Sequence, residues 1–192
     1  MLLQDLKILL KQKLTSHFEA VELSSIIGML IEEVSGWNRT QQILHQNTAF
    51  NQAQVDQIEK YTEQLISGKP IQYILGKAWF MGQNFIVNEN VLIPRPETEE
   101  LVEWIISYAN IKNKTLSILD IGTGSGCISI ALKMALPHCE ISGLDVSKEA
   151  LKVAQLNAKN LNVSIQWMEQ NILDTVALEN AYDIIVCNPP YI

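Results

Sequence analysis

The second half of the chain alternates between two hydrophobic patterns, and this alternation restricts the fold more than any other feature of the sequence. Four short segments are almost wholly apolar, and two segments between them have helical periodicity. The apolar segments cover residues 116–121, 140–145, 163–168 and 182–187, and the helical ones 125–135 and 147–160. Nearly continuous apolar strands that alternate with helices are typical of parallel sheets buried on both faces. The sequence therefore predicts an α/β domain.

The first 70 residues have helical periodicity instead. Leucines recur at helical spacing near the N-terminus, and a second helix from about residue 19 to 34 ends at Gly36. A shorter segment covers 40–46. A fourth helix begins after Asn51, a good N-cap residue, and ends before Gly68 and Pro70. We expect a small all-α bundle that carries no catalytic residue pattern of its own.

Residues 71–96 connect these two regions. Short β-type segments on either side of Gly82 predict a hairpin, and Ile93-Pro94-Arg95-Pro96 is held out of helix by its prolines. A helix is expected over residues 97–108. We thus predict a helical domain at 1–70, a β-hairpin and Pro-rich linker at 71–96, and an α/β domain at 97–192.

The charge and cysteine content argue against several classes of function, without excluding an enzyme that acts on nucleic acid. The formal net charge is −7, with 8 basic against 13 acidic residues up to position 110 and 6 against 8 after it. Neither half offers the broad positive surface that duplex nucleic acid requires. Cys127, Cys139 and Cys187 are scattered singly, which predicts reduced, buried thiols in a cytoplasmic protein. No metal site, secretion signal or membrane-spanning run of about 20 apolar residues can be recognised.

The first motif with chemical content is Asp120-Ile121-Gly122-Thr123-Gly124-Ser125-Gly126, at the turn from an apolar strand into a helix. Glycines there let the backbone turn tightly and approach a ligand closely. Asp145 ends the next strand, about 20 residues after the last glycine, where an acidic residue meets ribose hydroxyls in dinucleotide folds. Up to this point, a nicotinamide dehydrogenase and a methyltransferase are equally compatible with the sequence.

The tetrapeptide Asn188-Pro189-Pro190-Tyr191 separates these two possibilities. It follows the fourth strand and is therefore expected beside the glycine-rich turn, at the carboxyl edge of the sheet. A planar NH2 group is a poor nucleophile unless its hydrogens are held by rigid acceptors. The Asn188 side chain and a backbone carbonyl between prolines are suited to this, and Tyr191 could stack on the planar group. The motif therefore favours methyl transfer to a planar amino group.

With these motifs, the sequence resembles the release factor glutamine methyltransferases, the PrmC/HemK family. The resemblance also rests on Pro70-Ile71-Gln72-Tyr73-Ile74-Leu75-Gly76 and Ile93-Pro94-Arg95-Pro96-Glu97-Thr98-Glu99, which are more specific than the other two motifs. It implies a Rossmann-like, class I S-adenosylmethionine-dependent methyltransferase domain after the small all-α bundle and short β-hairpin linker. The family continues well beyond the NPPY motif, so the α/β domain is expected to be C-terminally incomplete and the fourth strand an uncovered apolar edge.

The resemblance also assigns roles to individual residues. S-adenosylmethionine (SAM) would be the cofactor, with the glycine-rich turn around its methionine part, Asp145 on the ribose and two residues after the third strand near the adenine. The implied cofactor-binding residues are Gly122, Thr123, Gly124, Ser125, Gly126, Asp145, Asn171, Ile172 and Asn188. Ile172 stands where the family has an aromatic residue, and Asn171 where it has an acidic one.

The implied reaction is methylation of the side-chain amide nitrogen (N5) of the glutamine in the Gly-Gly-Gln motif of peptide chain release factors. Asn188, Pro189, Pro190 and Tyr191 would hold the substrate amide, and the helical domain would recruit the release factor, with no direct contact to nucleic acid or membrane. Two alternatives stay open: an adenine-N6 or ribosomal RNA guanine-N2 methyltransferase, and an inactive truncated fragment that binds partners.

Overall fold

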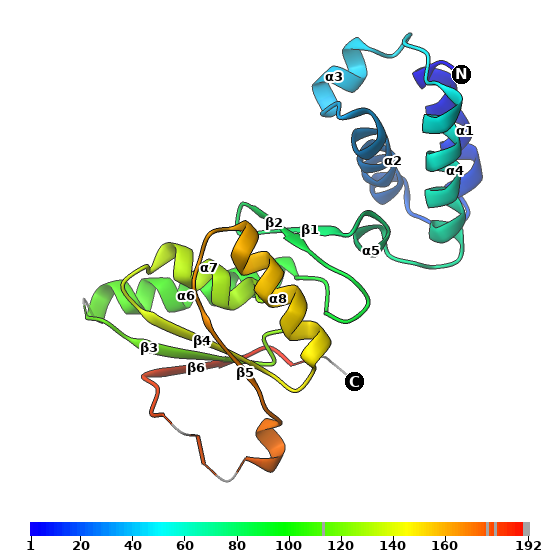
Figure 1. The fold of residues 1–192 in the computed structure, drawn as a ribbon. Coiled ribbons are helices and arrows are strands. Elements are labelled where there is room, and N and C mark those ends of the chain that lie inside the picture. The colour runs from blue at the N-terminus through cyan, green and yellow to red at the C-terminus, as the bar shows by residue number, and fades with distance from the viewer. Residues whose placement is uncertain (113, 176, 179, 190–192) are drawn as a thin grey trace. The chain divides into compact units, whose positions relative to one another are not determined.

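The computed structural model describes residues 1–112, 114–175, 177–178 and 180–189. The chain forms two compact units, Met1–Leu75 and Gly76–Ile192 (Figure 1). Each unit has its own hydrophobic core.

The first unit is the all-α bundle expected from the sequence. Its helices are α1 (Leu3–Leu14), α2 (Ala20–Ser35), α3 (Arg39–Leu44), α4 (Gln52–Ile66) and α5 (Ile71–Leu75). α3 and α4 each begin with a capping box, in which an N-cap asparagine and a glutamine three residues later satisfy each other's backbone N–H groups. Asn51 caps α4 as predicted. The leucines of α1 and the isoleucines of α2 are buried together.

Helix α5 lies in the stretch that we expected to be a linker. Ile71 is buried, and Ile74 and Leu75 pack against the core of the helical unit. A helix of five residues is shorter than two turns, so it leaves no periodic pattern from which it could be recognised.

The second unit contains the predicted hairpin and parallel α/β sheet. Its elements are β1 (Lys77–Phe80), β2 (Gln83–Ile86), α6 (Pro96–Lys112), β3 (Ser117–Ile121), α7 (Cys127–Ala135), β4 (Glu140–Asp145), α8 (Lys148–Asn160), β5 (Gln166–Glu169), the 3-10 helix η1 (Ile172–Asp174) and β6 (Ile184–Cys187). β1 and β2 are antiparallel. The larger sheet has the order β5-β4-β3-β6, and all its pairs are parallel. Figure 1 shows α6, α7 and α8 on one face of it.

This strand order fixes where a ligand can bind. The chain moves outward from β3 through β4 to β5 and then returns to place β6 on the other side of β3. Open α/β sheets bind ligands at such a change of direction, outside the carboxyl ends of the strands.

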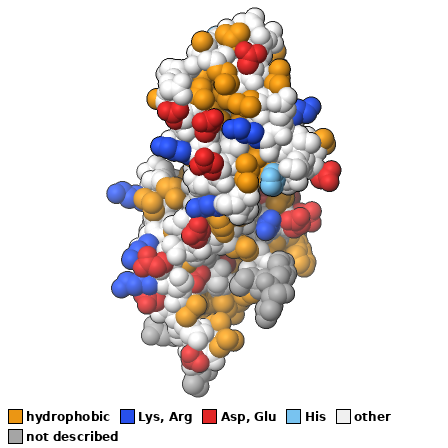
Figure 2. Space-filling view, turned by 90° about the vertical axis from the view of Figure 1, so that its right-hand side faces the viewer, with side chains coloured by type: hydrophobic (Ala, Val, Ile, Leu, Met, Phe, Trp, Pro, Cys, Tyr) orange, Lys and Arg blue, Asp and Glu red, His pale blue; other side chains and the backbone are white. Residues whose placement is uncertain are grey.

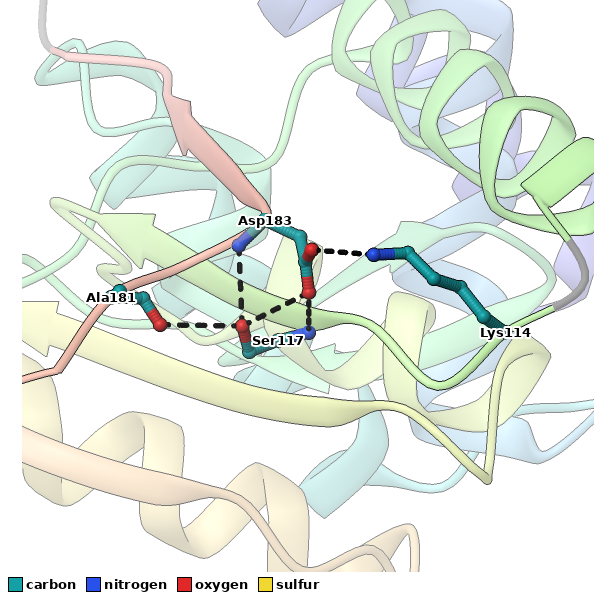
Figure 3. A network of polar contacts seen from close by, with 4 residues as sticks. All are labelled: Lys114, Ser117, Ala181 and Asp183. Carbon is teal, nitrogen blue, oxygen red and sulfur yellow. Dashed lines mark hydrogen bonds and ion pairs between the residues drawn. The ribbon is translucent and has the colours of Figure 1, made fainter.

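A polar network holds the amino end of β6 against β3 (Figure 3). Asp183 accepts hydrogen bonds from the Ser117 backbone N–H (2.9 Å) and from the Lys114 ammonium (2.8 Å). The pKa of the Asp183 carboxyl is lowered mainly by the hydrogen bond from Lys114. The Asp183 N–H in turn donates to the Ser117 carbonyl at 2.9 Å. The register of β6 is thus set at its start, which places the residue that follows its end, Asn188.

Two expected boundaries shift for local reasons. β5 begins at Gln166 rather than Val163, because the Val163 N–H bonds the Ala158 carbonyl and Asn162, at φ 55°, completes a turn that ends α8. α7 begins at Cys127 rather than Ser125, because Gly126 has a φ of 79° and cannot be part of a right-handed helix. Ser147 caps α8 as predicted, and its hydroxyl accepts from the Ala150 N–H.

The cysteines correct one expectation. Cys127 and Cys139 are buried, but Cys187 is exposed. Among the described residues, Cys187 and Ile185 of β6 are exposed while Val186 between them is buried, so Cys187 projects from the face of the sheet opposite α6, α7 and α8. Within these same residues, no helix is long and apolar enough to cross a membrane, and no group of acidic, histidine and cysteine side chains could hold a metal ion.

Gly143→Ala should destabilise the protein because this glycine faces a tryptophan ring. A Cβ at position 143 would lie 2.4 Å from Cζ3 and 2.7 Å from Cε3 of Trp167, and 3.1 Å from the Ser129 hydroxyl. Relieving this overlap requires the ring to move, and we expect the free energy of unfolding to fall by about 2 kcal/mol. Denaturant unfolding measures this change.

The matched control is Gly28→Ala in α2, where an added Cβ meets nothing within 4 Å. This variant should be stabilised by up to about 1 kcal/mol, because alanine is the better helix former. Equal effects of the two substitutions would contradict the packing of Trp167 over Gly143.

Candidate active site

A cleft of about 520 Å³ opens at the carboxyl ends of β3, β4 and β6. Ligand-binding pockets in proteins have volumes of roughly 300–1,000 Å³. The lining includes most of the residues that the sequence indicated. It consists of Asn90, Val91, Leu92, Ile121, Gly122, Gly124, Leu144, Asp145, Val146, Ser147, Ala150, Gln170, Asn171, Ile172, Leu173, Cys187, Asn188 and Pro189.

The glycine-rich turn has a conformation that requires glycine. Gly122, Gly124 and Gly126 have φ values of 71°, 54° and 79°, in the left-handed region that side chains disfavour. A Cβ at Gly126 would also lie 3.0 to 3.1 Å from atoms of Trp167, Ala154 and Ile130. At Gly122, by contrast, an added Cβ would meet no protein atom within 4 Å. The first glycine therefore presents bare backbone to the cleft, and the last permits close packing behind it.

Asp145 organises the rim of the cleft around its carboxylate. One oxygen accepts from the Gly124 N–H at 2.8 Å, and the other accepts from the Ser147 N–H at 2.9 Å. The residue is only 9% exposed. A carboxylate oxygen can accept more than one hydrogen bond, so both oxygens keep acceptor capacity for a ligand that enters the cleft.

Behind the turn, Asp120 forms a buried polar cluster that sequence reasoning had not assigned. Its Oδ2 accepts from the hydroxyls of Thr123 (2.6 Å) and Ser129 (2.7 Å), while its Oδ1 has no partner. Burial raises the pKa of the Asp120 carboxyl, against the opposing effect of these two hydrogen bonds. The Thr123 hydroxyl thus faces the interior, and Thr123 and Ser125 are absent from the lining of the large cleft.

Asn157 of α8 is a second residue that sequence reasoning missed. Its side chain exchanges two hydrogen bonds with the backbone of Ile86, at 2.7 and 2.9 Å, and donates a third to the Ser125 carbonyl at 2.9 Å. It is 1% exposed. The hairpin and the glycine-rich turn are thereby fastened to the same helix. A lone asparagine in a helical pattern gave no signal of this role.

The residues expected near the adenine also lie in the cleft wall. The Asn171 side chain caps η1, where its oxygen accepts from the Leu173 N–H (3.1 Å) and its amide donates to Asp174 (2.7 Å). Ile172 is partly buried and contributes an apolar surface. Both residues are thus placed beside Asp145 in one cavity.

Asn188 stands directly after β6, on the opposite side of the cleft from Asp145's strand. Its side-chain amide donates to the Thr98 hydroxyl at 2.9 Å. It also lines a smaller pocket of about 40 Å³ between the glycine-rich turn and residues 92–95. Pro189 lines the large cleft. Pro190 and Tyr191, which were expected to hold the substrate, lie outside the described residues.

Family models and relatives match both units. A model described as PrmC N-terminal domain matches residues 7–76, and one described as Methyltransferase small domain matches residues 105–192. The chain is 46% identical to the release factor glutamine methyltransferase of Flavobacterium psychrophilum over its whole length, covering 68% of that protein. The corresponding enzyme of Enterococcus faecalis is 44% identical over 83% of this chain, which covers 57% of that protein. The Bacillus subtilis enzyme is 36% identical over 91% of this chain, which covers 62% of that protein.

Among solved structures, a SAM-dependent methyltransferase from Agrobacterium tumefaciens superimposes with a TM-score of 0.52 over 59% of this chain and 39% of that one. At 22% identity, this likeness supports the fold and nothing more specific. The chain therefore has the methyltransferase fold, and it spans about two thirds or less of the relatives' length.

Proposed function

This chain belongs to the SAM-dependent release factor glutamine methyltransferases, and we propose that it methylates the N5 amide nitrogen of the glutamine in the Gly-Gly-Gln motif of peptide chain release factors. One observation carries the proposal: the glycine-rich turn, Asp145 and Asn188 line a single cleft at the carboxyl edge of the sheet. The first two have the chemistry to bind a nucleoside with a zwitterionic tail, and the third has the chemistry to hold an amide.

The residues of the cleft fit SAM. Space for a ligand lies over the bare backbone of Gly122, and the Asp145 carboxylate has acceptor capacity for ribose hydroxyls. Ile172 offers an apolar wall for a base. The Asn171 side-chain oxygen already accepts a hydrogen bond from the Leu173 N–H, so it would bind an adenine amine by accepting a second one. Bound SAM would supply a methyl group on a positively charged sulfur, which a nucleophile can attack.

The role of Asn188 follows from the electronic structure of an amide. The nitrogen of a glutamine side chain is conjugated with its carbonyl and reacts only when its hydrogens are held so that its electron density points at the methyl group. The Asn188 oxygen would accept a hydrogen bond from one of these N–H groups, and the proton that the nitrogen loses once it carries the methyl group would pass to water. Pro189 restricts the backbone beside it, which lowers the entropic cost of holding the substrate amide in a reactive orientation.

We further propose that the helical unit recruits the release factor. A groove of about 260 Å³ lies among α1, α2 and α3, with an apolar floor that includes Leu23 and Ile27. Lys7, Lys11 and Arg39 also line it. Burial, followed by the charge of Arg39, lowers the pKa of Lys7. Basic groups crowded around an apolar groove favour a partner segment that combines apolar and acidic side chains.

Arg39→Glu should therefore weaken binding of the release factor without slowing the chemistry. We expect the KM for the release factor to rise about two- to fivefold and kcat to stay the same, because a charge at the rim of a groove acts on binding alone. Lys60→Glu is the control, since Lys60 is exposed on α4 and does not line the groove. Equal effects of both reversals would indicate general electrostatics rather than a binding groove.

The function is tested by incubating the protein with SAM and a release factor and by locating the added methyl group with mass spectrometry. We expect one methyl group on the glutamine of the Gly-Gly-Gln motif. Methylation of RNA or DNA instead would overturn the proposal. The face seen in Figure 2 argues against that outcome, because acidic and basic side chains are interspersed on it and its described residues form no continuous basic surface.

A further inference from the structure

The Pro-rich motif at residues 93–99 takes part in the site through Thr98. In the structure its last residues form the first turn of α6, which begins at Pro96. Thr98 is 6% exposed, and its hydroxyl lies 2.9 Å from the Asn188 amide nitrogen, 90 positions away in the sequence.

We infer that Thr98 is a positioning residue that orients the Asn188 amide for methyl transfer, an inference that rests on the proposed function. The two ends of an asparagine side chain have opposite hydrogen-bonding character: the nitrogen only donates and the oxygen only accepts. Because the nitrogen is bound at Thr98, the oxygen is the end left for a ligand in the cleft. If the Asn188 amide were turned the other way, its NH2 group would face the NH2 group of the substrate. Both groups are donors, so no hydrogen bond could form between them.

The first turn of α6, which carries Thr98, is held in place from two sides. Val102 and Ile105, one and two turns further along α6, are buried in the core of the unit. The neighbouring Glu99 accepts a hydrogen bond from the Met81 N–H at 2.6 Å, which ties the turn of the β1–β2 hairpin to the same helical turn. Met81 has a φ of 47°, so this contact stabilises a strained turn residue. The hydroxyl thus belongs to a rigid part of the unit, as a group that orients another must.

Kinetics of two substitutions test the inference. Thr98→Val keeps the shape of the side chain and removes the hydroxyl, whereas Thr98→Ser keeps the hydroxyl. We expect Thr98→Val to lower kcat about three- to tenfold, the value of one hydrogen bond, with the KM for SAM unchanged. Thr98→Ser should restore the rate. In an Asn188→Ala background, Thr98→Val should cause no further loss, because the two residues act as one unit. Full kcat in Thr98→Val, or an additive loss in the double variant, would overturn the inference.

A spectroscopic measurement separates this inference from the proposed function. In ¹H–¹⁵N spectra, the Asn188 side-chain signals are identified by their loss in Asn188→Ala. In the wild-type protein they should show proximity to the Thr98 methyl group, and this proximity and the chemical shift should change in Thr98→Val. If the contact is absent, the inference fails whatever the activity. If the contact is present but release factors are not methylated, the proposed function fails and the placement of the amide stands.

Discussion

Asn188→Ala is expected to lower kcat for methyl transfer about 100- to 1,000-fold, the usual cost of removing a hydrogen-bonding group that acts in the transition state. The affinity for SAM should change much less, by about tenfold at most. The difference arises because the substrate amide needs its acceptor when the nitrogen attacks, whereas the cofactor has many other contacts along the cleft. Single-turnover methylation of a release factor, with SAM binding measured by calorimetry, gives both quantities.

The matched control for this substitution is Asn160→Ala, because Asn160 is exposed at the end of α8 and does not line the cleft. It should methylate at the wild-type rate. A variant at Asn188 that kept a rate within a few fold of wild type would show that the amide acceptor lies elsewhere, and the proposed mechanism would be wrong.

The parts of the site that could be predicted from the sequence are those with local causes. The glycine-rich turn joins an apolar strand to a helix, and the acidic residue ends the next strand. Few residues lie between them, and the geometry of a strand–helix–strand unit is fixed. The Ser147 cap of α8 follows from the preference of helix N-termini for hydroxyl side chains. The apolar character of the strands predicted that they run parallel. Parallel strands place their carboxyl ends at one edge of the sheet, where Asn188 and Asp145 line the same cleft.

The rest depends on contacts between distant residues. The bond between Asn188 and Thr98 spans 90 positions, and those between Asn157 and Ile86 span 71. No periodic pattern records such a pairing, because a single polar side chain in a helix looks the same whether it faces solvent or another segment. The partners of Asp120 were not predicted for another reason: Thr123, whose hydroxyl donates to Asp120, lies in the glycine-rich turn and was considered only as a ligand contact.

Asp145→Ala is expected to weaken SAM binding about 100-fold, because it removes a charged acceptor of hydrogen bonds from a nearly buried site. Calorimetric titration measures the loss. Glu149→Ala is the control: it removes a carboxylate from the exposed first turn of α8, where Glu149 pairs with Lys152, and should leave the affinity unchanged. Unchanged affinity in Asp145→Ala would contradict the assignment of this residue to the cofactor.

A loss of affinity in Asp145→Ala could have two physical origins, because the carboxylate also accepts from the Gly124 and Ser147 N–H groups. Adenosine distinguishes them, since it carries the ribose but lacks the methionine part that the glycine-rich turn would surround. If Asp145 binds the ribose, the affinities for adenosine and SAM should fall by the same factor. If it acts only by holding Gly124 in its left-handed conformation, SAM should be weakened and adenosine should not. We expect the first result, because both carboxylate oxygens keep acceptor capacity after the backbone is satisfied.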